Sequence, residues 1–191
     1  MSRLGIVKVG MERGVNSYIV SCATTREAVV VDPGEPAQKL LGQLGGLTVR
    51  HLVATHGHPG HLAGKDDLKA ATGAPSAMHM ADAKQYLRSA DRYLLDGDEL
   101  DFGEFRMRVL HTPGHTAGSL CLLVANHLFT GDTLLAGGLG KEMPDTDLRQ
   151  QLFSIASRLL RLPPATAVYP GHGAVTSLAN ELASNPYLRG A

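Results

Sequence analysis

The sequence repeats one local pattern, in which a short β-branched or apolar run ends in a turn rich in glycine and proline. Such runs are typical of buried strands, and such turns end them sharply. The runs cover residues 28–31, 51–55, 105–110, 127–130 and 167–169, and they lead into Asp32-Pro33-Gly34, His56-Gly57-His58-Pro59-Gly60-His61, His111-Thr112-Pro113-Gly114-His115, Gly131-Asp132-Thr133 and Pro170-Gly171-His172-Gly173. A chain of this kind must fold so that several polar side chains lie at strand ends.

The remaining segments predict an α/β fold in which helices fall between groups of strands. Further strands are expected over 15–21, 76–79 and 119–124, and helices near Pro36, over 62–71, 81–89 and 147–161, and from Ser177. The helix over 147–161 carries one apolar stripe, made of Leu148, Leu152, Ile155, Ala156, Leu159 and Leu160. This order suits two sheets covered by helices. The 191 residues suit a single domain spanning 1–191.

Composition narrows the function classes. Lys plus Arg and Asp plus Glu number 18 each, so no basic excess indicates a nucleic-acid partner or an anionic membrane surface. No apolar run reaches the roughly 18 residues of a membrane span, and the N-terminus does not look like a secretory signal. Cys22 and Cys121 lie in apolar segments, so we expect two buried reduced thiols, without a polar neighbour to lower their pKa, in a cytoplasmic protein.

The nine histidines divide into two groups. A lone loop histidine is usually satisfied by hydrogen bonds, but three within six residues, with others in matching turns, indicate a metal site. The predicted ligands are His56, His58, His61, His115, Asp132 and His172. The other four histidines, which are expected to be structural, are His51, His79, His111 and His127. Only His111 is near the predicted site, where it could contact a metal ligand without binding the metal itself.

These motifs make the chain resemble the metallo-β-lactamase superfamily, most closely the short bacterial glyoxalase II-type hydrolases. The resemblance rests on Val31-Asp32-Pro33-Gly34, residues 55–61 and 112–119, Gly131-Asp132-Thr133, residues 169–173, Glu181 and Asn185-Pro186-Tyr187. It implies an αββα sandwich of two mixed sheets flanked by helices, with the metal site at one edge. It also implies that His56, His58 and His115 hold a first ion. His61 and His172 would hold a second, with Asp132 as a bridge.

One position departs from the family pattern H-x-H-x-D-H, because Gly60 stands where the family has aspartate. Glycine offers no ligand, so the second ion would be held more weakly by its remaining three ligands and water. Asp66 and Asp67 follow closely but are expected to be solvated charges of a helix. One or two zinc ions are therefore expected, with iron as the alternative metal.

The resemblance implies hydrolysis of a thioester or related ester-like bond in a small molecule, with a metal-bound hydroxide as nucleophile. His56, His58 and Asp132 are the predicted catalytic residues, and Lys141 is a candidate for binding an anionic substrate. Full-length glyoxalase II enzymes add a C-terminal helical region that binds glutathione, and this sequence stops at Ala191. Glutathione specificity is therefore not implied.

Two other functions stay open. Persulfide dioxygenases share the implied fold and use one iron held by two histidines and an aspartate, which here would be His56, His115 and Asp132. Gly60 leaves that triad untouched. The third alternative is a non-catalytic binding protein with a degraded site, since a fold does not fix a function. The sequence does not indicate an oligomeric state.

Overall fold

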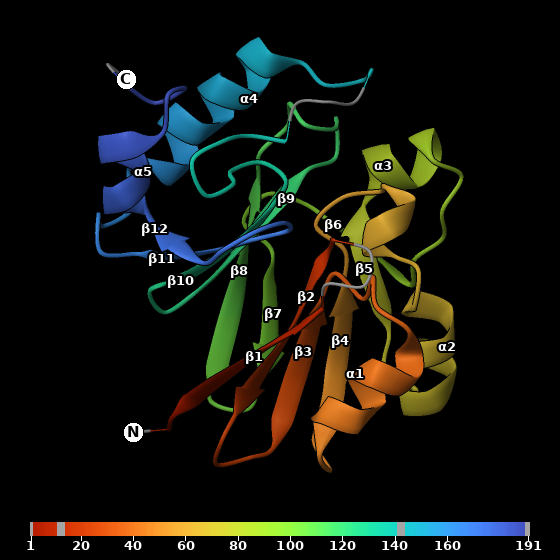
Figure 1. The fold of residues 1–191 in the computed structure, drawn as a ribbon. Helices are drawn as coiled ribbons and strands as arrows, with labels where there is room; N and C mark the ends of the chain where they lie inside the picture. Colours follow the sequence, from red (N-terminus) through yellow and green to blue (C-terminus); the bar gives the residue numbers. More distant parts are fainter. Residues whose placement is uncertain (1, 11–13, 141–143, 190–191) are drawn as a thin grey trace.

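The computed structural model describes residues 2–10, 14–140 and 144–189. Two six-stranded sheets pack face to face, and helices cover their outer faces (Figure 1). Each sheet contains both parallel and antiparallel neighbours. The expected sandwich of two mixed sheets flanked by helices is confirmed.

The first sheet is built from the N-terminal half of the chain. Its strands lie in sequence order: β1 (Leu4–Gly10), β2 (Asn16–Cys22), β3 (Glu27–Val31), β4 (Thr48–Val53), β5 (Ser76–His79) and β6 (Arg92–Leu94). The pairs from β1 to β3 are antiparallel, and those from β3 to β6 are parallel. Helices α1 (Ala37–Leu44) and α2 (Lys65–Thr72) therefore return the chain between parallel strands.

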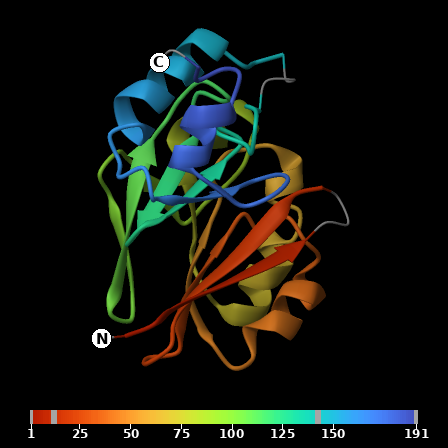
Figure 2. The same ribbon diagram turned by 60° about the vertical axis from the view of Figure 1, so that its left-hand side comes forward.

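The second sheet uses the rest of the chain in the order β12 (Thr176–Ser177), β11 (Ala167–Pro170), β10 (His127–Gly131), β9 (Leu120–Val124), β8 (Phe105–His111) and β7 (Glu99–Phe102). Only β10 and β11 are parallel, and α4 (Leu148–Ser154) lies between them in the sequence. Helix α5 (Leu178–Ser184) follows β12. In Figure 2, α1 and α2 lie on one side of the molecule and α4 and α5 on the other.

Alternation along the strands explains why they read as continuous apolar runs. In β2, Tyr18 and Val20 belong to the core between the sheets, whereas Ile19 packs in the cluster beneath α1 and α2. In β9, Leu122 belongs to the core between the sheets and Cys121 to the cluster beneath α4 and α5. Both faces of these strands are covered, so neither face needs polar residues.

Three expected helices differ from those observed. In the segment 62–71 the helix α2 begins only at Lys65, and a 3₁₀ turn at Pro59–His61 precedes it within the Gly- and Pro-rich turn after β4. The segment 81–89 is shorter, as α3 (Met80–Gln85), and it has ended before Leu87, which adopts a φ of 52°.

No helix in the described part of the chain is long and apolar enough to cross a bilayer.

The segment 147–161 shows the most informative difference. Helix α4 passes into a π-helical turn at Ile155–Leu159, and the wider turn rotates the following residues about the axis. Leu148 and Ala156 of the expected stripe are exposed, whereas Gln151 and Ser154 are buried. The Gln151 amide donates hydrogen bonds to the carbonyls of Asp132 and Thr133, at 3.1 and 2.9 Å. The buried face of α4 therefore braces a ligand-bearing loop.

Candidate metal centre

The six predicted ligands lie in loops that follow the carboxyl ends of four strands. His56 follows β4, His115 follows β8, Asp132 follows β10 and His172 follows β11. Five of the six side chains are buried, with exposed fractions between 2% and 8%, and His172 is partly exposed. Because the two sheets bring these strand ends to one edge of the sandwich, residues more than a hundred positions apart become neighbours.

Two groups of ligand atoms converge at this edge. Atoms of His56, His58 and His115 lie within 4.8 Å of one another, and so do atoms of His56, His61 and Asp132. The Asp132 carboxylate lies between the groups, with Oδ1 3.6 Å from His61 Nε2 and Oδ2 3.6 Å from His115 Nε2. His172 Nε2 completes the cluster at 3.3 Å from Asp132 Oδ2. The geometry thus brings all six predicted ligands together.

The donor atoms of this cluster fit a cation. His56 Nε2, His61 Nε2 and Asp132 Oδ1 are buried and have no hydrogen-bond partner among the described residues. Buried polar atoms are nearly always paired, and an unpaired one is destabilising by about 1–3 kcal/mol. His58 Nδ1 and His115 Nε2 also face each other at 3.1 Å. A metal ion held by imidazole nitrogens and a carboxylate oxygen would satisfy these atoms together.

The second ring nitrogen of each histidine is held from outside the cluster, as is usual for metal ligands. Two rings use backbone carbonyls, since His115 Nδ1 lies 2.7 Å from Gly140 O and His172 Nδ1 lies 2.5 Å from Gly14 O. The other three use side chains: His61 Nδ1 with Asp32 Oδ2 at 3.0 Å, His56 Nδ1 with Thr55 Oγ1 at 3.1 Å, and His58 Nε2 with Tyr86 Oη at 3.2 Å. The rings are therefore oriented with one nitrogen free to face an ion.

Two buried carboxylates that sequence reasoning did not assign support the ligands. Asp32, read from sequence as part of a turn, has a φ of 50° and accepts hydrogen bonds from Thr55 N and Oγ1 at 2.7 and 2.8 Å, besides contacting His61. Asp82 lies in α3, where nothing in the sequence marks it. A buried aspartate directly after a strand was a usable signal for Asp32.

Asp82 joins the two loops that supply the first group of ligands. Its Oδ2 accepts hydrogen bonds from Gly57 N at 2.7 Å and Thr116 Oγ1 at 2.8 Å, and its Oδ1 accepts one from Gly118 N at 2.6 Å. Gly57 lies between His56 and His58, and Thr116 follows His115. One carboxylate thereby fixes the distance between these loops.

The charges of the cluster are coupled. Burial holds the pKa of His56 well below its usual value, with His61 adding to the effect. Burial alone would lower the pKa of His61, but Asp32 and Asp132 outweigh it and raise the pKa to about 10. Burial would raise the pKa of Asp132, yet the neighbouring His172 and His61 rings keep it well below its usual value. A cation that uses His61 must therefore displace a proton.

Comparison with known proteins agrees with this centre. Residues 10–172 match the family model described as the metallo-beta-lactamase superfamily. The chain belongs to this superfamily. Its loops 56–61, 112–115, 131–133 and 170–173 carry the six residues that the superfamily resemblance predicts as ligands.

Several relatives and solved structures in the superfamily are similar along most of the chain. The hydroxyacylglutathione hydrolase of Rhodospirillum rubrum is 34% identical over 90% of this chain and 67% of its own length. The crystal structure of the BLEG-1 B3 metallo-beta-lactamase has a TM-score of 0.88 at 28% identity, over 97% of this chain and 100% of its own. ETHE1 from Myxococcus xanthus has a TM-score of 0.83 at 31% identity, over 97% and 83%.

A third solved structure bears on the metal. TTHA1623, in a di-iron-bound form, has a TM-score of 0.80 at 32% identity, and the match covers 96% of this chain and 100% of that one. Its iron is a property of that protein. Zinc and iron both remain candidates for this superfamily member.

Gly60 is not required by the backbone at its position. A Cβ built there meets only Val15 Cγ2, at 3.2 Å, and the φ of Gly60 lies outside the left-handed region. Gly57 is different, because its Cβ would lie 2.2 Å from Tyr86 Cδ2. The Cβ of an aspartate at position 60, as in the superfamily pattern, therefore needs only a small adjustment of Val15.

The other residues singled out from sequence lie outside the cluster or outside the described chain. Lys141 falls outside the described residues, so its proposed role stays a prediction. Asp66 and Asp67 are exposed in the first turn of α2, as expected. His111 Nε2 lies 3.0 Å from Ala117 O, a contact with the loop that carries His115, and its ring stacks on His79 at 4.3 Å.

The two thiols are buried as expected, but the expectation that neither has a polar neighbour that lowers its pKa is wrong for both. Cys22 and Cys121 are free and fully buried. Burial alone would raise the pKa of the Cys22 thiol, but hydrogen bonds with Ser2, at 3.1 Å from the sulfur, and Thr25 lower it. Burial raises the pKa of Cys121 to about 12. Both thiols lie within strands, and Cys121 Sγ lies 3.3 Å from Thr112 Oγ1, in the loop that carries His115.

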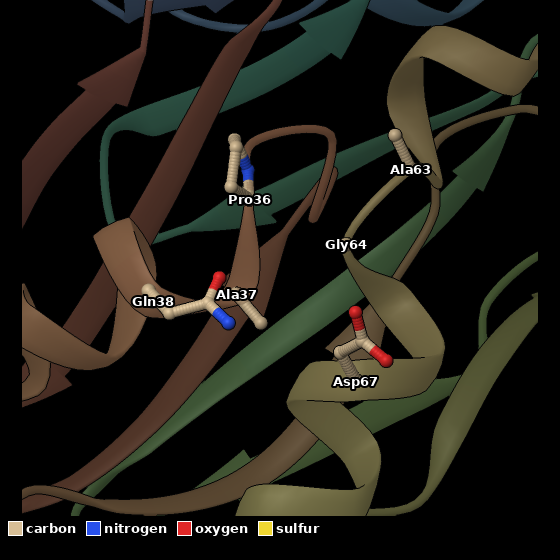
Figure 3. A pocket seen from close by; sticks show the side chains of 6 residues that line it. All are labelled: Pro36, Ala37, Gln38, Ala63, Gly64 and Asp67. Carbon is tan, nitrogen blue, oxygen red and sulfur yellow. The ribbon is translucent and has the colours of Figure 1, made fainter.

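The described part of the chain also has a hollow that none of the six ligands lines. It measures about 180 Å³ and lies between the N-terminal ends of α1 and α2 (Figure 3). Its lining residues are Pro36, Ala37, Gln38, Ala63, Gly64 and Asp67. With a single carboxylate and no convergent donors, it offers no second reactive centre.

Proposed function

We propose that this protein is a metal-dependent hydrolase that cleaves a thioester or a related ester-like bond in a small molecule. The observation that carries the proposal is the convergence of His56 Nε2, His61 Nε2 and Asp132 Oδ1, which are buried and unpaired among the described residues. Atoms left in this state indicate a centre built to bind metal and then substrate rather than a set of structural histidines.

The relatives favour the thioester. Three of them, 34–40% identical to this chain, are named hydroxyacylglutathione hydrolases, and a hydroxyacylglutathione is a thioester. Thioesters suit this site, because a thiolate leaves without a strong general acid. The match covers 48–68% of those proteins, so the proposal concerns the bond that is cleaved and does not extend to glutathione recognition.

The residues divide between two positions. His56, His58 and His115 would hold the first ion, and His61, His172 and Asp132 the second, with Asp132 facing both. When bound, zinc would lower the pKa of a coordinated water to about 7 and so supply hydroxide as the nucleophile. Asp132 keeps its negative charge at neutral pH because its pKa is held low, and it anchors His61 and His172 at the second position.

The test uses protein stripped with a chelator and reloaded with zinc, assayed with S-lactoylglutathione and S-acetyl-N-acetylcysteamine. We expect His56→Ala to lower kcat/KM for the cleaved probe by about 100-fold or more, since it removes a ligand. His127→Ala is the matched control, because His127 contacts Tyr169 and no ligand, and it should retain activity. Cleavage unaffected by His56→Ala, or absent from zinc-loaded protein with both probes, would contradict the proposal.

A second candidate is persulfide oxidation by one iron ion held by His56, His115 and Asp132. The observation that favours it is Gly60, because the missing carboxylate weakens the second position and leaves this triad complete. Iron content alone does not decide, since TTHA1623 holds two irons. Oxygen uptake by iron-loaded protein with glutathione persulfide would support this candidate, and no uptake would exclude it. A metal-loaded protein inactive in both assays would indicate a binding protein.

A further inference from the structure

Tyr86 covers the first pair of ligands from outside the centre. It follows the last residue of α3, and its ring lies against the backbone between His56 and His58, where a Cβ on Gly57 would come within 2.2 Å of Tyr86 Cδ2. The rings of Tyr86 and His58 meet edge to face, with their centroids 5.1 Å apart. Glycine at position 57 is thus the condition for this contact.

The Tyr86 hydroxyl connects His58 to a carboxylate on another loop. Tyr86 Oη lies 3.2 Å from His58 Nε2 and donates a hydrogen bond to Asp145 Oδ2. Gln85 Nε2 donates a second hydrogen bond to the same oxygen at 2.9 Å. Asp145 Oδ1 lies 3.8 Å from His58 Nε2, too far for a direct hydrogen bond.

The metal centre fixes the direction of these hydrogen bonds. A ligand nitrogen must be free of its proton, so His58, whose Nδ1 faces His115, carries its proton on Nε2. Nε2–H then donates to Tyr86 Oη, and Tyr86 O–H donates to Asp145. Each donor has one acceptor, and the chain ends on a carboxylate.

We propose that Tyr86 and Asp145 are positioning residues that hold His58 with Nδ1 turned toward the metal. The proposal rests on the metal centre that underlies the proposed function. In many metal sites, a carboxylate accepts a hydrogen bond directly from the ring nitrogen of the histidine that does not bind the metal. Here the Tyr86 hydroxyl lies between the histidine and the carboxylate.

His58 differs from the other ligands in where this support comes from. The outer nitrogens of His61 and His56 contact buried side chains, and those of His115 and His172 contact backbone carbonyls. Asp145 instead keeps about a quarter of its side chain exposed. It also lines a hollow of about 250 Å³ beside the His115 loop, with Pro113, Gly114, Thr116, Ala117, Asp147 and Gln150. A molecule bound in that hollow would contact the residue that orients His58.

The test measures metal binding, so it does not depend on knowing the substrate. Chelator competition gives the Kd for Zn²⁺, and the visible spectrum of Co²⁺-loaded protein reports the ligand set, for wild type, Tyr86→Phe, Asp145→Asn and the double variant. We expect Tyr86→Phe to weaken the first metal about 10- to 100-fold and to change the cobalt spectrum. Tyr93→Phe, in β6, is the matched control and should change neither.

The double variant tests whether Asp145 acts through Tyr86. We expect it to bind metal no more weakly than Tyr86→Phe alone, because residues in one hydrogen-bond chain are not additive. Unchanged affinity and spectrum in Tyr86→Phe would overturn the proposal, and fully additive losses would overturn the role of Asp145. Asp145→Asn alters only a loop side chain, so it remains informative if Tyr86→Phe folds poorly. Wild type that binds metal without cleaving thioesters would refute the proposed function and leave this proposal standing.

Discussion

Replacing Asp82 by asparagine should lower both the stability of the protein and its affinity for zinc, although Asp82 is not itself a predicted ligand. The carboxylate is fully buried and accepts three hydrogen bonds, from Gly118 N at 2.6 Å, Gly57 N at 2.7 Å and Thr116 Oγ1 at 2.8 Å. Asparagine has one acceptor oxygen. If that oxygen stays with Gly118, the new amide group faces the Gly57 N–H, and two donors oppose each other.

The magnitude follows from that geometry. One unpaired buried backbone donor is destabilising by about 1–3 kcal/mol, and loss of the charge weakens the bonds that remain, so we expect a loss of about 2–4 kcal/mol. For a chain of this size each kcal/mol lowers Tm by about 2–4 °C, which predicts a shift of roughly 5–15 °C in metal-free protein. Because Asp82 spans two ligand loops, zinc affinity should also fall about 10- to 100-fold.

The assay is thermal unfolding of metal-free protein, followed by chelator competition for zinc. Asp66→Asn is the matched control, because the Asp66 side chain is 86% exposed, and it should stay within about 0.5 kcal/mol of wild type. An Asp82→Asn variant as stable as that control, with unchanged zinc affinity, would refute the view that this carboxylate ties the loops together.

Three further predictions follow from the same geometry. Gly60→Asp should raise affinity for a second zinc, measured by titration, and an unchanged stoichiometry and affinity would mean that the second position is built differently. Gly57→Ala should destabilise the fold by about 1–3 kcal/mol in urea unfolding, because its Cβ collides with Tyr86; a neutral result would contradict the packing. His61, whose pKa is raised above its unfolded value to about 10, should stabilise metal-free protein fully below pH 6.5 and progressively less as the pH rises toward 10. The stability advantage of wild type over His61→Gln should shrink over that range, and an advantage that grows with pH would contradict the sign.

The sequence located the six clustered residues because each lies in a loop that follows a strand, where a short apolar run is followed by a Gly- or Pro-rich turn. The same logic reached Asp32 only as a turn residue, since its partners Thr55 and His61 come from a different loop. Asp82 could not be found, because a single aspartate in a helix has no local pattern. Its role depends on the packing of α3 against both ligand loops.

The outer helix 147–161 shows a different limit. Periodicity located it, but Leu148 of the expected stripe is exposed, and Gln151 and Ser154, which precede the π-helical turn at Ile155–Leu159, are buried. Gln151 and Ser154 are buried because they bond the Asp132 and Pro113 carbonyls, at 3.1 and 2.7 Å. A hydrophobic stripe marks such polar positions as solvent-facing. Tertiary hydrogen bonds to the ligand loops therefore override the apolar pattern.

The most direct test of the metal centre is a crystal structure of metal-reloaded protein with anomalous diffraction recorded at the metal absorption edge. The prediction is an anomalous peak about 2.0–2.2 Å from His56 Nε2, His58 Nδ1 and His115 Nε2. A second, weaker peak should lie among His61, Asp132 and His172. A peak ligated by other residues, or protein that retains no metal while these six side chains keep their positions, would contradict the account.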